Sequence, residues 1–309
     1  MENYKPVIDN ILTEVKKAVS GKDEELKKII TAVAAGGNIL LDDIPGVGKT
    51  TIALAFSKAL GLKVNRIYLT PDVLPTDIIG FTMYNKRTDS FEYKEGVVMC
   101  NLLLADEINR TSSKTQSALL QAMEEKRVSV DGETYDIPSP FIVIATQNPV
   151  GSIGTSRLPE SQLDRFLIKL SLGYPDRQNE IDILKEHKKR NPLDDVKNVI
   201  DKKELVEIQK AAAEVFVDDK IYEKIALLSE KTRNNPYIRM GVSPRGSIAL
   251  LRMSMAIALC EGRDYVTPAD IKAVFTDTCS HRIVLTSQAA AEETTAVGVL
   301  EKILKSERL

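Results

Sequence analysis

The sequence predicts an α/β fold: a core with a five-stranded parallel sheet, followed by a C-terminal all-helical lid domain. Three observations predict it. Short apolar runs alternate with helix-like stretches in the first part of the chain, a glycine-rich turn joins one such run to a helix, and the pattern becomes helical after Pro175. At 309 residues the chain is long enough for two domains, which we place at residues 1–175 and 176–309.

Five short apolar runs are the expected strands of the sheet. Each is four to five residues long and mostly apolar, as expected for parallel strands that are buried on both faces. In chain order they are Asn38–Leu41, Arg66–Leu69, Leu102–Ala105, Phe141–Ala145 and Phe166–Leu170.

Two hairpins are expected to leave this sheet. Asp131-Gly132 lies between two strand-like segments and accepts the positive φ angles of a two-residue turn, which predicts a hairpin at about 128–135. Thr88-Asp89-Ser90 supplies turn residues for a second, two-stranded hairpin at about 81–96.

The C-terminal part carries apolar residues at spacings of three and four, the period of an amphipathic helix. Thr267 and Pro268 mark the start of one helix, because threonine is a common N-cap and proline needs no hydrogen-bond partner at the first position. The other expected helices are Gln178–Lys189, Lys203–Val215, Lys220–Thr232 and Pro244–Glu261.

The composition argues against several classes of protein. A net charge of −2 gives no basic excess, so nucleic acid is not an expected partner. The N-terminal segment has no apolar run of signal-peptide or membrane-span length, and Cys100, Cys260 and Cys279 form no CxxC pair, so we expect a cytoplasmic protein without disulfides or zinc. His187 and His281 lack neighbouring ligand residues and are expected on the surface.

The strongest local signal is Pro45-Gly46-Val47-Gly48-Lys49-Thr50-Thr51, between the first strand and the following helix. In such a loop the main-chain amides point at an anion, Lys49 reaches the β and γ phosphates, and the Thr50 hydroxyl can bind Mg²⁺. Asp43 replaces the first glycine of the usual GxxxxGK[ST] pattern. We expect the loop to keep its conformation, because aspartate tolerates left-handed angles. Repulsion of about 2 kcal/mol between carboxylate and phosphate at roughly 8 Å would weaken nucleotide binding without abolishing it.

A second signal is the apolar run Leu102–Ala105, which ends in Asp106 and Glu107. At the carboxyl edge of the sheet, Asp106 would complete the Mg²⁺ shell through water while Glu107 polarises the attacking water. Taken alone, two acids after an apolar run more often indicate plain solvated polarity at a strand end. The glycine-rich loop upstream favours the catalytic interpretation.

Three further polar residues are candidates for sensing the phosphates. Asn148 follows the fourth strand and can hydrogen-bond the γ phosphate and the water, although an asparagine before proline also forms turns. Arg165 ends a short helix and is a candidate arginine finger; the alternative is an ion pair with Asp164 or Glu160. Arg245 lies in the first turn of a helix, where a cation opposes the helix dipole and therefore requires an anionic partner.

Together these stretches resemble the MoxR group of AAA+ ATPases over nearly the whole chain. GGNILLDDIPGVGKTT, LTPDVLPTDIIG, NLLLADEINRTSSKTQSALLQAMEE, VSVDG, ATQNP, LPESQLDRF and GVSPRG occur in the family's order and approximate spacing. The resemblance implies an AAA+ P-loop core and these roles: Lys49 and Thr50 in Walker A, Asp106 and Glu107 in Walker B, Asn148 as sensor 1, Arg165 as arginine finger and Arg245 as sensor 2.

The resemblance also implies cofactors and partners. These are ATP/ADP and Mg²⁺, self-association into a ring that is generally a hexamer, a partner with a von Willebrand type A domain, and a protein client that is remodelled or matured. The segment 81–96 is similar to the family's insert in the second helix, and 128–135 to its pre-sensor hairpin. The sequence departs from the family at Asp43 and at Gly96–Met99, where a Gly-Pro-Ile-Phe-like segment is common.

Two other functions compete with ATP-driven remodelling. A nucleotide-gated assembly or scaffold subunit would bind ATP and hydrolyse little of it, and Asp43 is the feature that keeps this alternative open. A DNA-dependent motor is disfavoured by the acidic pI near 5.9 and by the absence of an aromatic and basic strand-binding stretch.

Overall fold

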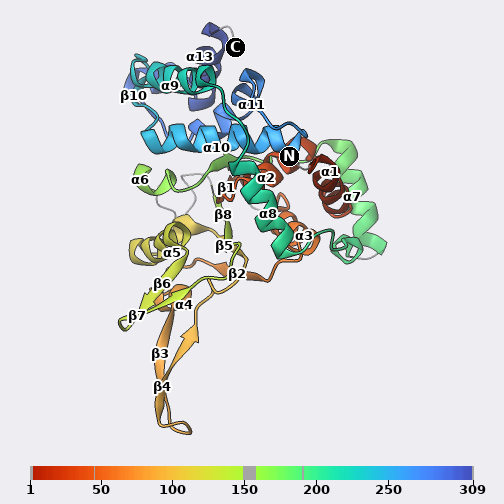
Figure 1. Ribbon diagram of the computed structural model, residues 1–309, viewed down its shortest axis with the longest axis vertical. Coiled ribbons are helices and arrows are strands. Elements are labelled where there is room, and N and C mark those ends of the chain that lie inside the picture. Colours follow the sequence, from red (N-terminus) through yellow and green to blue (C-terminus); the bar gives the residue numbers. More distant parts are fainter. Residues whose placement is uncertain (1–2, 45, 149–157, 190, 308–309) are drawn as a thin grey trace.

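The computed structural model describes residues 3–44, 46–148, 158–189 and 191–307 (Figure 1). Its N-terminal part contains the predicted five-stranded parallel sheet, and the strands have the order β2-β5-β8-β1-β9. Each strand overlaps one of the five expected runs, with small shifts at the ends. The strands are β1 (Ile39–Asp42), β2 (Val64–Tyr68), β5 (Leu102–Asp106), β8 (Ile142–Gln147) and β9 (Ile168–Leu170).

The sheet is buried on both faces. Ile39 and Leu41 of β1 belong to one hydrophobic core and Leu40 belongs to the other, because successive side chains of a strand point to opposite faces. This double burial explains why the strands are continuous apolar runs. One core includes α1 (Lys5–Lys16), α2 (Asp23–Ala34) and α3 (Lys49–Ala59), and the other includes α4 (Pro75–Ile79) and α5 (Ser113–Glu125).

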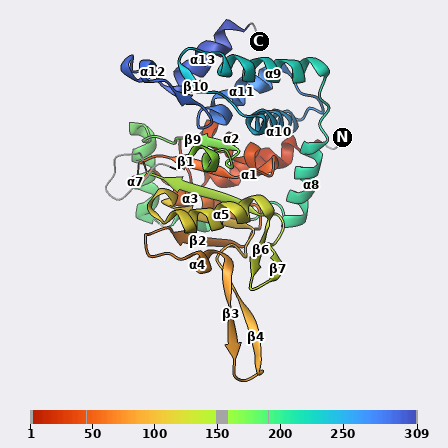
Figure 2. The same ribbon diagram turned by 90° about the vertical axis from the view of Figure 1, so that its left-hand side faces the viewer.

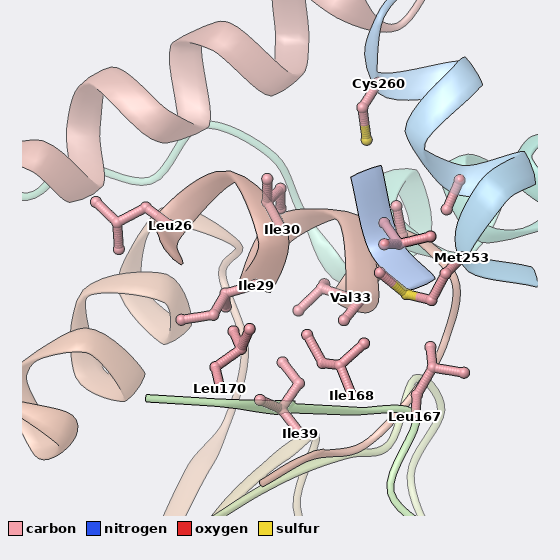
Figure 3. Packing of buried hydrophobic residues seen from close by; sticks show 14 of the residues in the cluster. Leu26, Ile29, Ile30, Val33, Ile39, Leu167, Ile168, Leu170, Met253 and Cys260 are labelled. Carbon is pink, nitrogen blue, oxygen red and sulfur yellow. The ribbon is translucent and has the colours of Figure 1, made fainter. Parts of the chain in front are cut away.

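Helix α2 joins the sheet to the C-terminal helices. Figure 3 shows Ile29 and Val33 of α2 directed toward Ile39 and Ile168 of the sheet, with Met253 of α10 beside them. All five side chains are fully or almost fully buried. The lid therefore shares one continuous core with the sheet.

The C-terminal part is helical, as predicted, and also contains one short antiparallel strand pair, β10 (Ile238–Met240) with β11 (Val284–Leu285). Helix α10 crosses above the sheet (Figure 1). The helices are α7 (Arg177–Lys189), α8 (Lys202–Ala213), α9 (Asp219–Arg233), α10 (Pro244–Cys260), α11 (Pro268–Cys279), α12 (Ser287–Ala291) and α13 (Ala296–Ser306). Short helices η1 (Ile108–Arg110), α6 (Glu160–Leu163) and η2 (Pro192–Asp195) complete the described helices.

Both predicted hairpins are present. The hairpin of β3 (Gly80–Asn85) and β4 (Ser90–Glu95) projects away from the body of the molecule (Figure 2). The second, β6 (Arg127–Val130) and β7 (Glu133–Asp136), turns at Asp131-Gly132, where both residues have positive φ as expected. Tyr93 stacks on Tyr135 with ring centroids 3.9 Å apart, so the two hairpins support each other.

One expectation from the composition was wrong: His281 is buried. It is 5% exposed, and its Nε2 atom lies 3.1 Å from the Phe166 carbonyl oxygen. Burial lowers the pKa of His281 well below its usual value, so the ring is neutral at pH 7. The His187 side chain lies outside the described side chains. Along the part of the chain that the structure describes, no helix combines the length and apolarity needed to cross a membrane.

The three cysteines lie in the hydrophobic interior. Cys100, Cys260 and Cys279 are all buried and free. Burial raises the pKa of Cys100 to about 11 and that of Cys260 and Cys279 to about 12, so all three remain thiols at pH 7.

Candidate active site

The glycine-rich loop leaves room for a ligand in front of helix α3. Gly46 and Gly48 both have a φ of 88°, and a Cβ atom added at either position would have no neighbour within 4 Å. Helix α3 begins at Lys49, so its first amides, which have no partner inside the helix, face this open space. Such a cradle fits an anionic group. Pro45, the first residue of the predicted loop, lies outside the described residues.

Lys49 is held by its own loop. Its side chain is buried, and its Nζ atom donates a hydrogen bond of 2.6 Å to the main-chain oxygen of Asp43. Burial lowers the pKa of the ammonium, while the nearby carboxylates of Asp43 and Asp106 act in the opposite direction. The charge that would neutralise a phosphate is therefore already positioned at the mouth of the loop.

Asp43 has a structural role that the sequence did not indicate. It is not among the described residues with positive φ, so the left-handed conformation considered for it was wrong. Its Oδ2 atom accepts hydrogen bonds from Ser171 Oγ at 3.1 Å, Leu172 N at 2.5 Å and Gly173 N at 2.6 Å, and its Oδ1 atom accepts one from Ile44 N at 2.8 Å. The carboxylate thus ties the loop to the segment after β9.

The two predicted magnesium ligands share one cationic neighbour. Asp106 ends β5 and is 5% exposed; its Oδ2 atom accepts a hydrogen bond of 2.8 Å from Arg66 Nε. Arg66 Nη2 also donates to Thr50 Oγ1 at 3.1 Å. A hydroxyl and a carboxylate that already enclose a positive group fit Mg²⁺, which takes its other ligands from phosphate and water. Among the described residues, no group of three or more His, Cys, Asp or Glu side chains forms a separate metal site.

Glu107 and Asn148 meet beside this pair. Glu107 Oε1 accepts a hydrogen bond of 3.1 Å from Asn148 Nδ2, and Glu107 Oε2 accepts one of 2.6 Å from Arg110 Nη1. The bond from Arg110 holds the pKa of Glu107 below its usual value, so the carboxylate is ionised. Glu107 has φ 59° and ψ 48°, a left-handed conformation that is rare for glutamate and concentrates at functional sites.

The two predicted arginines lie together, in a different place. Arg165 Nη1 forms an ion pair with Glu124 and donates to the Leu120 carbonyl oxygen at 3.0 Å, while Arg245 Nη2 lies 3.1 Å from the other Glu124 oxygen. The expected anionic partner of Arg245 is therefore Glu124. The same carboxylate, rather than Asp164 or Glu160, is the described partner of Arg165.

These arginines line a cavity of about 200 Å³ whose wall carries five cationic side chains together with the carboxylates of Glu124 and Asp164. Lys126, Arg252 and Arg282 also contribute to its wall, and no residue of the glycine-rich loop does. The fold consequently brings Asp106, Glu107 and Asn148 to the loop and keeps Arg165 and Arg245 away from it.

Arg282 connects the lid to the segment that contains Arg165. This lid side chain is 2% exposed; it donates from Nε to Asp164 Oδ1 at 2.7 Å, from Nη2 to the Phe166 oxygen at 2.6 Å and from Nη1 to the Leu167 oxygen at 3.1 Å. Asp164 also accepts a hydrogen bond of 2.9 Å from Ser243, the N-cap residue of α10. Two parts of the lid are thus bound to the end of the short helix before β9.

A second cavity of about 200 Å³ adjoins the glycine-rich loop. Its wall is partly apolar and comes from segments far apart in sequence, which explains why no local pattern revealed it. The lining residues include Ala18, Val19, Ser20, Lys22, Gly46, Val47, Gly48, Thr51, Pro175, Ile183 and Pro192. A flat heterocycle attached to a phosphate chain fits such a pocket.

The chain is similar to known proteins over nearly its whole length. A family model described as "ATPase family associated with various cellular activities (AAA)" matches residues 38–168, and a model of the AAA lid domain matches residues 230–303. The chain is 44% identical over 305 residues to the uncharacterised protein YeaC of Bacillus subtilis, covering 99% of this chain and 95% of that protein.

Two further relatives carry functional names. Chaperone MoxR1 of Mycobacterium tuberculosis is 36% identical over 308 residues, which cover 97% of this chain and 81% of that protein. The solved structure of a candidate ATPase from Cytophaga hutchinsonii matches with a TM-score of 0.91 and 37% identity, covering 99% of this chain and 95% of that one.

Proposed function

The chain belongs to the MoxR family of AAA ATPases, and from this premise we propose that it hydrolyses ATP to ADP and phosphate and couples the reaction to chaperone-like remodelling or maturation of a protein complex. The observation that carries the proposal is the meeting of four groups at one edge of the sheet. These are the loop 46–51, the Thr50 and Asp106 oxygens, the Glu107 carboxylate and the Asn148 amide.

Each of these groups has a part in hydrolysis. The amides of the loop and Lys49 bind the β and γ phosphates, and Thr50 and Asp106 hold Mg²⁺, which neutralises phosphate charge when bound. Glu107 accepts a proton from water as the water oxygen attacks the γ phosphorus and the bond to the ADP oxygen breaks. Asn148 orients that water, because its amide already contacts Glu107.

We assign the adenine ring to the cavity beside the loop. Val19, Val47 and Ile183 give it an apolar wall, while the phosphates would extend from there toward Lys49. Lys22 shapes the same region, since its Nζ atom donates to the carbonyl oxygen of Tyr174 at 3.2 Å.

Arg165 and Arg245 act on the nucleotide of a neighbouring subunit in this proposal. Both guanidinium groups lie in the cationic cavity on Glu124, away from the loop of their own chain. A γ phosphate from an adjacent copy would take the place of Glu124 as their anionic partner. The complete site therefore requires a ring, and a hexamer is the form that we propose.

The chaperone-like part rests on the printed name of the MoxR1 relative and on an exposed surface. Phe81, Met83, Tyr84 and Phe91 of the β3–β4 hairpin are exposed, Phe91 by 75%. Apolar side chains on a projecting element favour contact with another protein, which would be a client or a partner with a von Willebrand type A domain.

The first experiment replaces the proposed catalytic base. Glu107→Gln should bind ATP with magnesium as the unaltered chain does, yet release no phosphate above background, because the amide cannot accept the proton. Glu133→Gln, the same change on the exposed β6–β7 hairpin, is the matched control and should retain full turnover. Normal turnover by Glu107→Gln would contradict the assignment. A scaffold subunit would instead bind ATP and show little turnover even when unaltered.

A second experiment tests the action of the arginines between subunits. Arg165→Ala and Lys49→Ala should each be inactive alone and should recover part of the activity when mixed, because mixed rings contain interfaces with one intact loop and one intact guanidinium. A mixture of Arg245→Ala with Lys49→Ala should also recover part of the activity. If either mixture stays inactive, that arginine acts on the nucleotide of its own subunit or is needed for folding.

A further inference from the structure

Arg66 joins two residues that belong to different phosphate-binding motifs. It lies on β2, which is an edge strand of the sheet, next to β5. Its Nε atom donates to Asp106 Oδ2 at 2.8 Å and its Nη2 atom donates to Thr50 Oγ1 at 3.1 Å. The two acceptor atoms are the protein oxygens that we assigned to magnesium.

The surroundings of Arg66 allow its guanidinium to leave this position. The Arg66 side chain is 37% exposed, whereas that of Asp106 is 7% exposed. Arg66 Nη2 also donates to the Tyr68 hydroxyl, the guanidinium carbon lies 4.4 Å from the centroid of the Tyr68 ring, and Tyr68 is itself 54% exposed. A half-exposed aromatic ring can hold an arginine by a cation–π contact after its ion pair breaks.

A purely structural ion pair would not require these particular acceptors. A hydroxyl oxygen that accepts a hydrogen bond from Arg66 is less available to a metal ion, and a carboxylate paired with Arg66 has part of its charge neutralised. Bound magnesium would add two positive charges beside the guanidinium. The Arg66 guanidinium and a bound magnesium ion would therefore compete for the same oxygen atoms of Thr50 and Asp106.

We propose that Arg66 is an internal competitor of magnesium: its guanidinium occupies the position between Thr50 and Asp106 when no metal is bound, and it must move aside for the magnesium–nucleotide complex. The inference rests on the proposed function. It assigns Arg66 as a positioning residue that keeps the buried Asp106 paired and raises the magnesium concentration needed for ATP binding.

The test measures magnesium dependence without turnover. In the Glu107→Gln background, binding of a fluorescent ATP analogue is followed while Mg²⁺ is titrated, with and without Arg66→Gln. Glutamine keeps a polar side chain and removes the charge. The Mg²⁺ concentration for half-maximal binding should fall about tenfold, the size expected when a hydrogen bond to a charged group no longer competes.

A second readout uses the protein without nucleotide. In EDTA, Arg66→Gln should unfold at a lower temperature than the unaltered chain, because the buried Asp106 loses its cation. Added magnesium should raise the unfolding temperature of this variant more than that of the unaltered chain. Circular dichroism checks that the variant is folded. Arg66→Lys, whose single ammonium group is a compact point charge and not a planar fork, should give intermediate values in both measurements.

The matched control is Lys63→Gln. Lys63 directly precedes β2, is 59% exposed and pairs with Glu95 at 3.9 Å, so the same charge change there should leave the magnesium midpoint unaltered. An unchanged or higher midpoint in Arg66→Gln would overturn the inference and leave the ATPase proposal intact. Failure of the unaltered chain to bind ATP at any magnesium concentration would overturn the proposed function, and the inference with it.

Discussion

Replacing Asp43 by glycine restores the residue usual at this position of the loop and tests what the carboxylate does. If Asp43 mainly repels the nucleotide, Asp43→Gly should improve binding. The structure predicts a different result, because the carboxylate accepts four hydrogen bonds, three of them from the segment Ser171–Gly173. We expect Asp43→Gly to destabilise the protein and to leave ATP affinity within about threefold of its original value, since donors around a carboxylate offset its charge.

The size of the effect follows from these contacts. A hydrogen bond to a charged group contributes about 1.5–3 kcal/mol, and bonds that share one carboxylate are not additive. Leu172 N is buried and would lose its partner, whereas the other donors are part-buried and accessible to water. We therefore expect a loss of about 2–4 kcal/mol, to which the greater freedom of glycine in the unfolded chain adds ~0.5–1 kcal/mol.

Urea unfolding followed by circular dichroism measures this loss, and titration with a fluorescent ATP analogue measures affinity. Asp43→Asn keeps the shape and one acceptor oxygen, so its unfolding free energy should lie between those of the unaltered chain and Asp43→Gly. The reasoning would be refuted if Asp43→Gly unfolded at the same urea concentration and bound ATP about thirtyfold more tightly, the gain that corresponds to relief of ~2 kcal/mol of repulsion.

Three further predictions concern pH and packing. Arg110→Gln should raise the pKa of Glu107 and move the acidic limb of the ATPase pH profile to higher pH; an unmoved limb would show that Arg110 does not control this carboxylate. Below pH 6.5 the unfolded chain protonates His281 while the folded chain does not, so the unfolding free energy should fall by up to about 1.4 kcal/mol for each unit by which the pH decreases. Urea unfolding between pH 7 and 5 should show this loss in the unaltered chain, and His281→Gln should lack it. Gly96→Ala would place a Cβ atom 2.2 Å from the Ile78 oxygen and should cost about 1–3 kcal/mol of unfolding free energy; equal stability would contradict this packing.

The parts of the fold that local sequence determines could be predicted well. The apolar strands, the turn at Asp131-Gly132 and the start of helix α11 at Pro268 depend on neighbouring residues, and the structure confirms them. The sequence also indicated that Glu107 and Asn148 each follow a strand of the sheet; the structure adds that their side chains are in contact, because the carboxyl ends of adjacent parallel strands meet at one edge.

The remaining features depend on contacts between distant segments. Nothing next to Asp43 in sequence indicates that residues 171–173 will donate hydrogen bonds to it, and nothing near Arg165 indicates Glu124. His281 was predicted on the surface because its burial depends on the contact between the lid and the Phe166 carbonyl oxygen, which no neighbouring residue indicates. Arg66 had one visible signal, a charged residue within a strand-like run, yet its meaning required the position of Thr50.

The buried guanidinium of Arg282 has a mechanical consequence. Because it holds the carbonyl oxygens of Phe166 and Leu167 and the carboxylate of Asp164, the lid cannot tilt without carrying the backbone on either side of Arg165. The lid and the segment that carries Arg165 are thus expected to move together. In the proposed ring, a protein that binds the lid of one subunit would therefore shift the Arg165 that this subunit presents to the next copy.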